Sequence, residues 1–233
     1  FGAQVKVNPF RTQAEQFNWG LENFTFQSDW VMRMDADELV MPELAAELRE
    51  KLSTFPPSVT GLYVKRRVYF MGRWIRHGAY YPTWLLRIFR IGKAYSENRW
   101  MDEHLVLIEG TAERLENDII DENHNGLRAF TLKHENYAER EMMQMLNLQP
   151  QTTETKEDAN LGEQAKQKRW LKGNVYSRAP LFWRALAYFL YRFVIRFGFL
   201  DGREGLIFHV LQGFWYRFYV DAKIYDHERH AKN

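Results

Sequence analysis

Apolar residues near the N-terminus recur at the spacing of one helix face. They are Ala14, Phe17, Leu21 and Phe24, and intervals of three and four residues place side chains on one side of an α-helix. Upstream, valines alternate with polar residues over Gln4–Asn8, and Pro9 follows as a turn signal. The pattern predicts a short strand, a turn and a helix.

A second strand and helix follow. Strand-forming residues cluster between positions 30 and 34, and the run ends in Asp35-Ala36-Asp37-Glu38. Pro42 then opens a stretch with a leucine at every fourth position up to Leu52, and proline is well placed in the first turn of a helix. Two successive strand-then-helix units favour an α/β fold with a parallel sheet.

Strand patterns dominate the middle of the chain. Apolar and basic runs over 61–69 and 84–91 predict antiparallel strands, 105–109 predicts another, and 130–147 predicts a helix. The polar segment 149–163 predicts a linker. We therefore expect an α/β domain over 1–148, with a mixed, mainly parallel sheet flanked by helices, and a separate helical region over 164–233.

The helical region combines arginine with aromatic residues. Arg184, Tyr188, Arg192 and Arg196 recur on one predicted helix face, and the longest uncharged runs, 185–191 and 205–216, fall short of the roughly 20 residues that cross a bilayer. We expect amphipathic helices that lie on a membrane, with five residues facing it: Arg184, Arg192, Arg196, Trp183 and Trp215. The alternative is a buried helical hairpin packed on the first domain.

Charge divides the chain in the same way. Residues 1–160 carry 19 Lys and Arg against 24 Asp and Glu, a net −5, whereas residues 161–233 carry 13 against 6, a net +7. The basic part suits an anionic partner, either lipid headgroups or nucleic acid. The chain has no cysteine, which excludes disulfides, thiolate metal sites and cysteine nucleophiles.

The sharpest candidate for chemistry is the pair Asp35 and Asp37. Two carboxylates at the end of an apolar strand can hold a hard divalent cation, manganese or magnesium. Ligands of open α/β sheets bind outside the carboxyl ends of the strands, which is where this pair is expected. The alternative is a solvated turn in which Asp37 or Glu38 begins the next helix.

A second candidate is the stretch Trp100-Met101-Asp102-Glu103-His104. Either Asp102 or Glu103 could take a proton as a general base, with Trp100 and His104 on the acceptor side. The alternative is a surface turn whose tryptophan packs in the core. His124 is a candidate third metal ligand and His134 a weaker one, although histidines in turns and cores are commoner.

With these residues assembled, the chain resembles family 2 glycosyltransferases of bacterial lipopolysaccharide-core and surface-polysaccharide biosynthesis. The segments that carry the resemblance are Asn8-Pro9-Phe10, Asp29-Trp30-Val31, Asp35-Ala36-Asp37-Glu38, Leu86-Arg87-Ile88-Phe89-Arg90, Asp102-Glu103-His104 and Lys133-His134-Glu135-Asn136-Tyr137. The resemblance implies a GT-A fold, an inverting single displacement, a metal-bound nucleotide-sugar donor contacted by Asp35, Asp37 and Arg87, and a glycan or lipid-linked acceptor. The basic amphipathic helices favour a peripheral protein on the cytoplasmic face of the bacterial inner membrane, and their helical spacing argues against a nucleic-acid partner.

Two features depart from the family pattern. The opening strand and loop that hold the nucleotide base would precede Phe1, so we expect that the first strand or strands are absent from this sequence. Residues 212–217 do not match the Gln-x-x-Arg-Trp motif of processive members, so transfer of a single sugar is expected.

Two rival functions stay open at this point. One is a glycoside hydrolase that uses two carboxylates and needs neither metal nor nucleotide. The other is a non-catalytic module that binds membrane or nucleic acid through the basic aromatic C-terminal helices.

Overall fold

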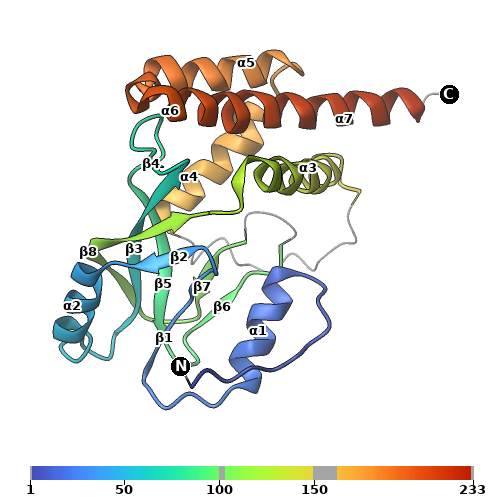
Figure 1. Cartoon of the computed structure of the whole chain (residues 1–233). Coiled ribbons are helices and arrows are strands. Elements are labelled where there is room, and N and C mark those ends of the chain that lie inside the picture. Colours follow the sequence, from blue (N-terminus) through green and yellow to red (C-terminus); the bar gives the residue numbers. More distant parts are fainter. Residues whose placement is uncertain (1, 100–102, 149–161, 232–233) are drawn as a thin grey trace.

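The computed structural model describes residues 2–99, 103–148 and 162–231. It is a mixed α/β structure in which a curled sheet carries helices on both faces and a layer of helices at one end (Figure 1). The α/β class predicted from the sequence is therefore confirmed. The linker expected over 149–163 lies almost entirely outside the described residues, and α4 begins at its last position, Glu163.

The main sheet runs in the order β1-β5-β3-β8-β2, with β4 added beside β3. Its strands are β1 (Trp30–Met32), β2 (Glu38–Val40), β3 (Val59–Phe70), β4 (Arg73–Trp74), β5 (Thr83–Arg90) and β8 (Thr111–Glu122). Only β3 and β8 are parallel, and the other pairings are antiparallel. The prediction of a mainly parallel sheet was wrong.

The tight turn between β3 and β4 explains why these two strands pair antiparallel. Gly72 and the residue before it both have positive φ, +76° and +53°, which is the backbone of a two-residue hairpin turn between β3 and β4. Strands joined by tight turns pair antiparallel. The single parallel pair is separated along the chain by β4 to β7, a connection long enough for a crossover.

Two helices cover the faces of the sheet. The side chain of Thr12 accepts a 3.1 Å hydrogen bond from the backbone N–H of Glu15 and so caps α1 (Gln13–Asn23). Pro42 occupies the first turn of α2 (Pro42–Lys51). The α2 side of the sheet is filled by Leu44, Val59, Leu62, Val64, Ile88, Leu115 and Ile119. The α1 side is filled by Leu86, Phe89, Ala94, Leu105 and Leu107, with Phe17 and Leu21 packed on them.

A small second sheet lies next to α1. It pairs β6 (Ala94–Ser96) with β7 (Leu105–Leu107). The amide of Asn18 donates to the carbonyl of Ser96 and accepts from its N–H, both at 2.8 Å, so α1 is tied to β6. The strand expected over Gln4–Asn8 does not form, and Val5 and Val7 are 85% and 92% exposed.

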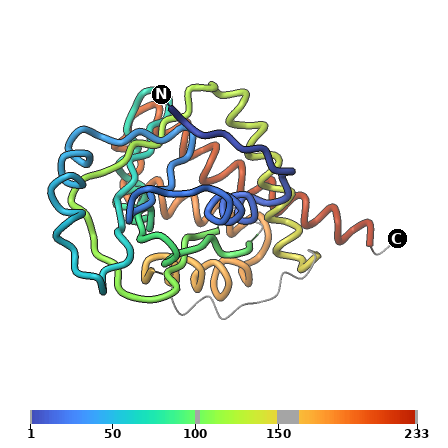
Figure 2. Tube along the Cα trace, turned by 90° about the horizontal axis from the view of Figure 1, so that it is seen from below, coloured from blue at the N-terminus to red at the C-terminus, as the bar shows by residue number. Residues whose placement is uncertain are grey.

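The C-terminal part is a helical hairpin, defined here as residues 183–230. Its first arm is α5 (Trp183–Leu190) continued by η3 (Tyr191–Ile195), and its tip includes η4 (Gly198–Asp201). Its second arm joins α6 (Gly202–Phe208), η5 (His209–Trp215) and α7 (Tyr216–His230), and the end of α7 projects beyond the rest of the molecule (Figures 1 and 2). The segment before it holds α4 (Glu163–Leu171) and η2 (Lys172–Tyr176).

The hairpin packs on α3 (Gly126–Met145). Their shared core contains Ala138 and Met142 of α3 with Tyr216, Val220 and Ile224 of α7. Among the described helices, none has the length and apolar character that crossing a membrane requires.

Several residues expected to face a membrane point inward instead. Arg184 is 4% exposed and hydrogen-bonds the carboxylate of Asp221. Arg192 lies inside, where its Nε donates to the carbonyl of Gly78 at 2.6 Å. Trp215 is half-buried in the core shared with α3. Only Arg196 and Trp183, which is 71% exposed, lie on the surface. An arginine side chain that bonds a buried acceptor is held in the protein interior, even where helical spacing predicts that it faces outward.

Candidate active site

The acidic residues after β1 form a closed turn. The backbone N–H of Asp35 donates to Oε2 of Glu38 at 2.9 Å, and the N–H of Glu38 donates to the carbonyl of Asp35 at 3.0 Å. The turn thus delivers the chain from β1 at one edge of the sheet to β2 at the other. The strand predicted before Asp35 and Asp37 forms, although it ends at Met32 and not at position 34.

Arg87 of β5 holds this turn from the sheet. Its Nη2 donates to Oδ2 of Asp35 at 2.9 Å and also to the buried carboxylate of Glu38. The side chain of Arg87 is only 7% exposed. The Nη2 of Arg87 thus bonds the acidic turn, whereas its buried Nε has no hydrogen-bond partner among the described residues. The predicted contact of Arg87 with the donor stays a prediction.

Arg33 connects the turn to a distant acidic residue. Its Nε lies 3.8 Å from Oδ1 of Asp35, and its Nη2 lies 3.4 Å from Oε1 of Glu103. The guanidinium also lies over the ring of Phe17 at 5.0 Å. The two acidic segments that the sequence singled out are therefore brought together by one arginine. Asp102 and Trp100, the other residues predicted there, lie outside the described residues.

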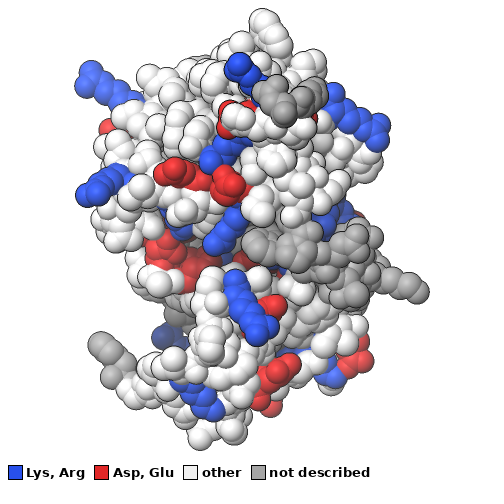
Figure 3. All heavy atoms as spheres, turned by 90° about the vertical axis from the view of Figure 1, so that its right-hand side faces the viewer, with Lys and Arg blue, Asp and Glu red and all other residues white. Residues whose placement is uncertain are grey.

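Asp37 lies on the other side of the turn, toward α3. Its Oδ2 accepts from the amide of Asn123 at 3.2 Å and is 3.9 Å from Nζ of Lys133. Nearby on β8, Asp121 pairs with Arg66 at 3.2 Å. Anionic and cationic side chains thus alternate through the site. Figure 3 shows one face of the molecule on which acidic side chains gather across the middle, with lysine and arginine side chains among them.

The acids differ in how readily they ionise. Burial opposes ionisation of Asp35, but the charges of Arg87 and Arg33 and the hydrogen bond from Arg87 lower its pKa below the ordinary value. Burial raises the pKa of Glu38 despite the same arginine. Burial also raises the pKa of Asp121, helped by the negative charges of Asp37 and Asp35. Asp35 is therefore the acid of this group best held as a carboxylate.

The segment that carries Glu103 is closed at its base by Glu97. The N–H of Glu97 donates to the carbonyl of His104 at 3.0 Å, and Oε1 of Glu97 accepts from the N–H of His104 at 2.9 Å. The same oxygen lies 3.1 Å from Nδ1 of His104 and 2.7 Å from Nη2 of Arg169 in α4. Burial opposes ionisation of Glu97, but the hydrogen bonds from His104 and Arg169 lower its pKa. His104 therefore anchors the loop and is 33% exposed.

Asp35 and Asp37 are the residues that the sequence predicts to hold a divalent cation. The side chains of Asp35 and Asp37 are 38% and 28% exposed, and magnesium is commonly held by one or two carboxylates plus substrate phosphates. Among the described residues no three His, Asp or Glu side chains are arranged to hold a metal. His124 is 76% exposed and lies 3.8 Å from Glu122, and the Nδ1 of His134 lies 2.7 Å from the carbonyl of Phe130. The histidine ligands predicted from the sequence are not assembled with Asp35 and Asp37.

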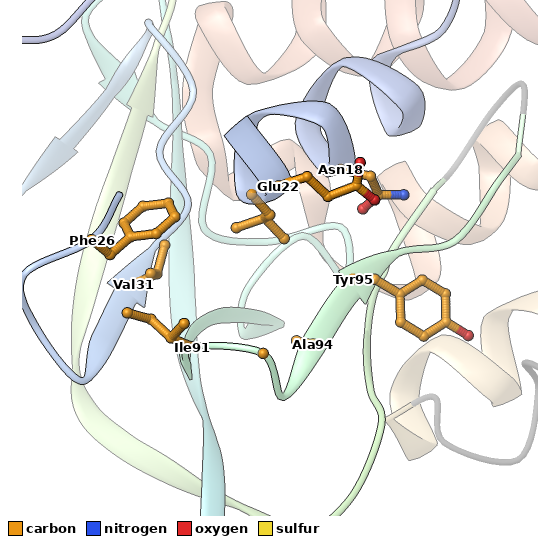
Figure 4. A pocket seen from close by; sticks show the side chains of 9 residues that line it. Asn18, Glu22, Phe26, Val31, Ile91, Ala94 and Tyr95 are labelled. Atoms are coloured by element: carbon orange, nitrogen blue, oxygen red, sulfur yellow. The ribbon is translucent and has the colours of Figure 1, made fainter. Parts of the chain in front are cut away.

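A hollow of about 450 Å³ lies beside the site, between α1, β1 and β6. It is lined by Asn18, Leu21, Glu22, Phe26, Val31, Ile91, Gly92, Ala94 and Tyr95. Figure 4 shows Phe26, Val31 and Ile91 together at one end and Tyr95 at the other. None of these residues belongs to the acidic cluster. The hollow therefore does not identify the reacting groups, although α1 borders it and also contacts Arg33 through Phe17.

A comparison with models of known protein families finds none that matches this chain. A functional proposal for this chain therefore rests on the contacts of the candidate site. Three residues of that geometry were missed by reading the sequence: Arg33, Glu97 and Arg169. Arg33 had a weak signal, because it is a lone charge at the end of an apolar strand. Glu97 and Arg169 had none, because their contact joins positions 72 residues apart.

Proposed function

We propose that the protein is an inverting, metal-dependent glycosyltransferase that moves one sugar from a nucleotide-sugar donor to a hydroxyl of a glycan or glycolipid. The observation that carries the proposal is the contact of Arg33 with both Asp35 and Glu103. It unites a carboxylate suited to a metal-bound diphosphate with a carboxylate suited to accept a proton.

Asp35 and Asp37 would hold the cation, manganese or magnesium, in this proposal. When bound, the cation supplies positive charge that stabilises the departing diphosphate. The ordinary pKa of Asp35, 3.8, already leaves it ionised at neutral pH, and Arg87 and Arg33 lower that pKa further. The ammonium group of Lys133 lies 3.9 Å from the carboxylate of Asp37.

Glu103 is the proposed general base, with Asp102 as the alternative left open by the sequence. The acceptor oxygen forms a bond to the anomeric carbon as the bond from that carbon to the diphosphate oxygen breaks, and the configuration inverts. The acceptor proton passes to the carboxylate of Glu103. Arg33 fixes that carboxylate relative to Asp35, and Glu97 fixes the base of its loop through His104.

The acceptor in this proposal is a glycan or lipid-linked glycan, and the protein would act peripherally at the cytoplasmic face of the bacterial inner membrane. The net charge of +7 over residues 161–233 supports an anionic surface as the place of action. A nucleic-acid partner is not part of the proposal.

Binding of a nucleoside diphosphate tests the proposal directly. The full protein should bind uridine or guanosine diphosphate in a manganese-dependent way in calorimetry, and Asp37→Ala should abolish binding while the far-ultraviolet circular dichroism is unchanged. Asp226→Ala is the matched control, because Asp226 is 73% exposed on α7 and remote in sequence from the site. Metal-independent hydrolysis of a glycoside would favour the hydrolase, and salt-sensitive oligonucleotide binding without donor binding would favour the adaptor.

A further inference from the structure

Both arms of the C-terminal hairpin carry an exposed stripe without charge. In the first arm the exposed residues at helical spacing are Ala187, Leu190, Tyr191, Val194 and Ile195; in the second they are Leu206, Ile207, Val210 and Phe218. The exposed fractions reach 64% at Ile195 and 44% at Leu206. Soluble proteins rarely leave so many apolar side chains contiguous on their surface without a binding function.

The two stripes lie on the same side of the hairpin. The arms pack along each other, α5 against η5, and form the outermost layer of the molecule (Figure 1). Each arm turns its other side toward the sheet and α3. The first does so with Arg192, which bonds Gly78, and the second with Phe208, whose ring lies 5.3 Å from that of Phe70. The exposed stripes therefore both face away from the body.

The hairpin tip extends the same apolar character. Phe197, Phe199 and Leu200 are 56%, 47% and 53% exposed. Two cations flank them in the sequence, the exposed Arg196 and Arg203. The stripes and the tip together are called the apolar face below.

Few acids lie near the apolar face. Between positions 183 and 225 the chain has three acidic residues. Asp201 lies 2.6 Å from Nδ1 of His77, Asp221 binds Arg184, and Glu204 lies 4.0 Å from Arg73. Asp201 and Asp221 are also buried, at 2% and 0% exposed. Because Asp201 and Asp221 are buried while Arg196 and Arg203 are exposed, the border of the apolar face at the hairpin tip is mainly basic.

We propose that the apolar face is a docking surface for an anionic phospholipid bilayer, into which the hairpin inserts from one side without crossing. Apolar side chains with basic residues at their border match the boundary between acyl chains and anionic headgroups. The proposal rests on the peripheral membrane location proposed above and assigns the surface responsible for it, and it is independent of the transfer reaction.

Vesicle flotation tests the docking surface. The full protein is mixed with vesicles of phosphatidylcholine alone or with about 30% phosphatidylglycerol, roughly the anionic content that gives a strong surface potential. It should float with the anionic vesicles. Ile195→Glu and, separately, Leu206→Glu should each lower the partition coefficient at least tenfold. Ile108→Glu is the matched control, because Ile108 is 55% exposed in the turn before β8, outside the hairpin, and should float like the unmodified protein.

Charge substitution separates lipid binding from general stickiness. Arg196→Gln and Arg203→Gln should each weaken binding to anionic vesicles about fivefold, the equivalent of roughly 1 kcal/mol per arginine, with no change on neutral vesicles. The proposal is overturned if the protein stays unbound at all compositions, or if both glutamate variants float normally. It is also overturned if sedimentation shows a dimer that Ile195→Glu dissociates, since the face would then bind a second copy.

Discussion

Arg33 and Glu103, 70 positions apart in the sequence, lie 3.4 Å apart in the structure. The same guanidinium reaches Asp35 at 3.8 Å and is 9% exposed. One side chain therefore sets the distance between the acidic turn after β1 and the acidic loop before β7.

Replacing Arg33 with glutamine should uncouple the two carboxylates. We expect the turnover number of sugar transfer to fall by tenfold to a hundredfold, because misplacing a reacting group by about 1 Å can cost that much. The Michaelis constant for the donor should change less, because Arg87 still holds Asp35. Steady-state kinetics measure both constants. Arg49→Gln, an exposed arginine of α2, is the control, and an Arg33→Gln enzyme with an unchanged turnover number would contradict the role proposed for this contact.

Glu97 should make the protein sensitive to acid. Its pKa is lowered in the folded state although burial opposes this, because hydrogen bonds from His104 and Arg169 favour the carboxylate. The stabilisation is therefore present above the ordinary pKa of 4.5 and is lost as pH falls through the folded value. Urea unfolding measured between pH 6 and pH 3 should show a smaller decline for Glu97→Gln than for the unmodified protein. An identical decline would mean that Glu97 is not the group responsible.

Much of the fold could be predicted from the sequence, but not the pairing of the strands. The helices at α1 and α2 followed from leucine and phenylalanine spacing. The longest strand that the sequence did not predict is β8, because acidic residues such as Asp118 interrupt its apolar pattern. That residue is 2% exposed, and Lys65 and Arg67 of β3 pair with it at 3.3 and 2.5 Å. A charge in a strand is acceptable when the neighbouring strand supplies its partner, and the sequence of one strand does not reveal the other.

The candidate site shows the same limit. Asp35 and Glu103 could each be proposed from local sequence, and their meeting through Arg33 could not. In the hairpin, helical spacing identified a face with Arg184 and Arg192 but not whether that face points to solvent or to the protein. The deciding partners, Asp221 and the carbonyl of Gly78, lie 37 and 114 positions away. Periodicity gives the faces of a helix, whereas long-range partners decide which face is buried.

A buried histidine should produce a second, separate pH dependence. His209 is fully buried, and neither ring nitrogen has a hydrogen-bond partner among the described residues. Its ring lies so near Gly78 that an added Cβ there would be 2.1 Å from Cε1. Burial and the positive charge of Arg192 lower the pKa of His209 to about 4, although the negative charge of Asp201 opposes this shift. The folded protein therefore keeps this ring neutral in weak acid.

The sign of the effect follows from the unfolded chain. Below the ordinary pKa of 6.5 the unfolded state takes up a proton that the folded state refuses until about pH 4. The free energy of unfolding should therefore fall by up to about 3 kcal/mol between pH 7 and pH 4 on account of His209. His209→Gln should lose this component in denaturant titrations at pH 7, 5.5 and 4. His227→Gln, exposed on α7, should keep it, and equal slopes for both variants would refute the assignment.

Among the ion pairs of the hairpin, we expect loss of the Arg184–Asp221 pair to lower the free energy of unfolding most. Their side chains are 2% and 0% exposed, and the second carboxylate oxygen of Asp221 accepts from the N–H of Phe182 at 2.7 Å. Removing one member leaves a buried charge without its partner, so Asp221→Ala should lower the free energy of unfolding by about 3–5 kcal/mol. The double variant Arg184→Leu, Asp221→Leu should lose less free energy of unfolding than the losses of the single variants Arg184→Leu and Asp221→Leu added together, because no unpaired charge remains. Asp226→Ala, on the same helix but 73% exposed, should change the unfolding free energy by less than about 0.5 kcal/mol. If Asp221→Ala behaves like Asp226→Ala, the ion pair does not hold the two arms of the hairpin together.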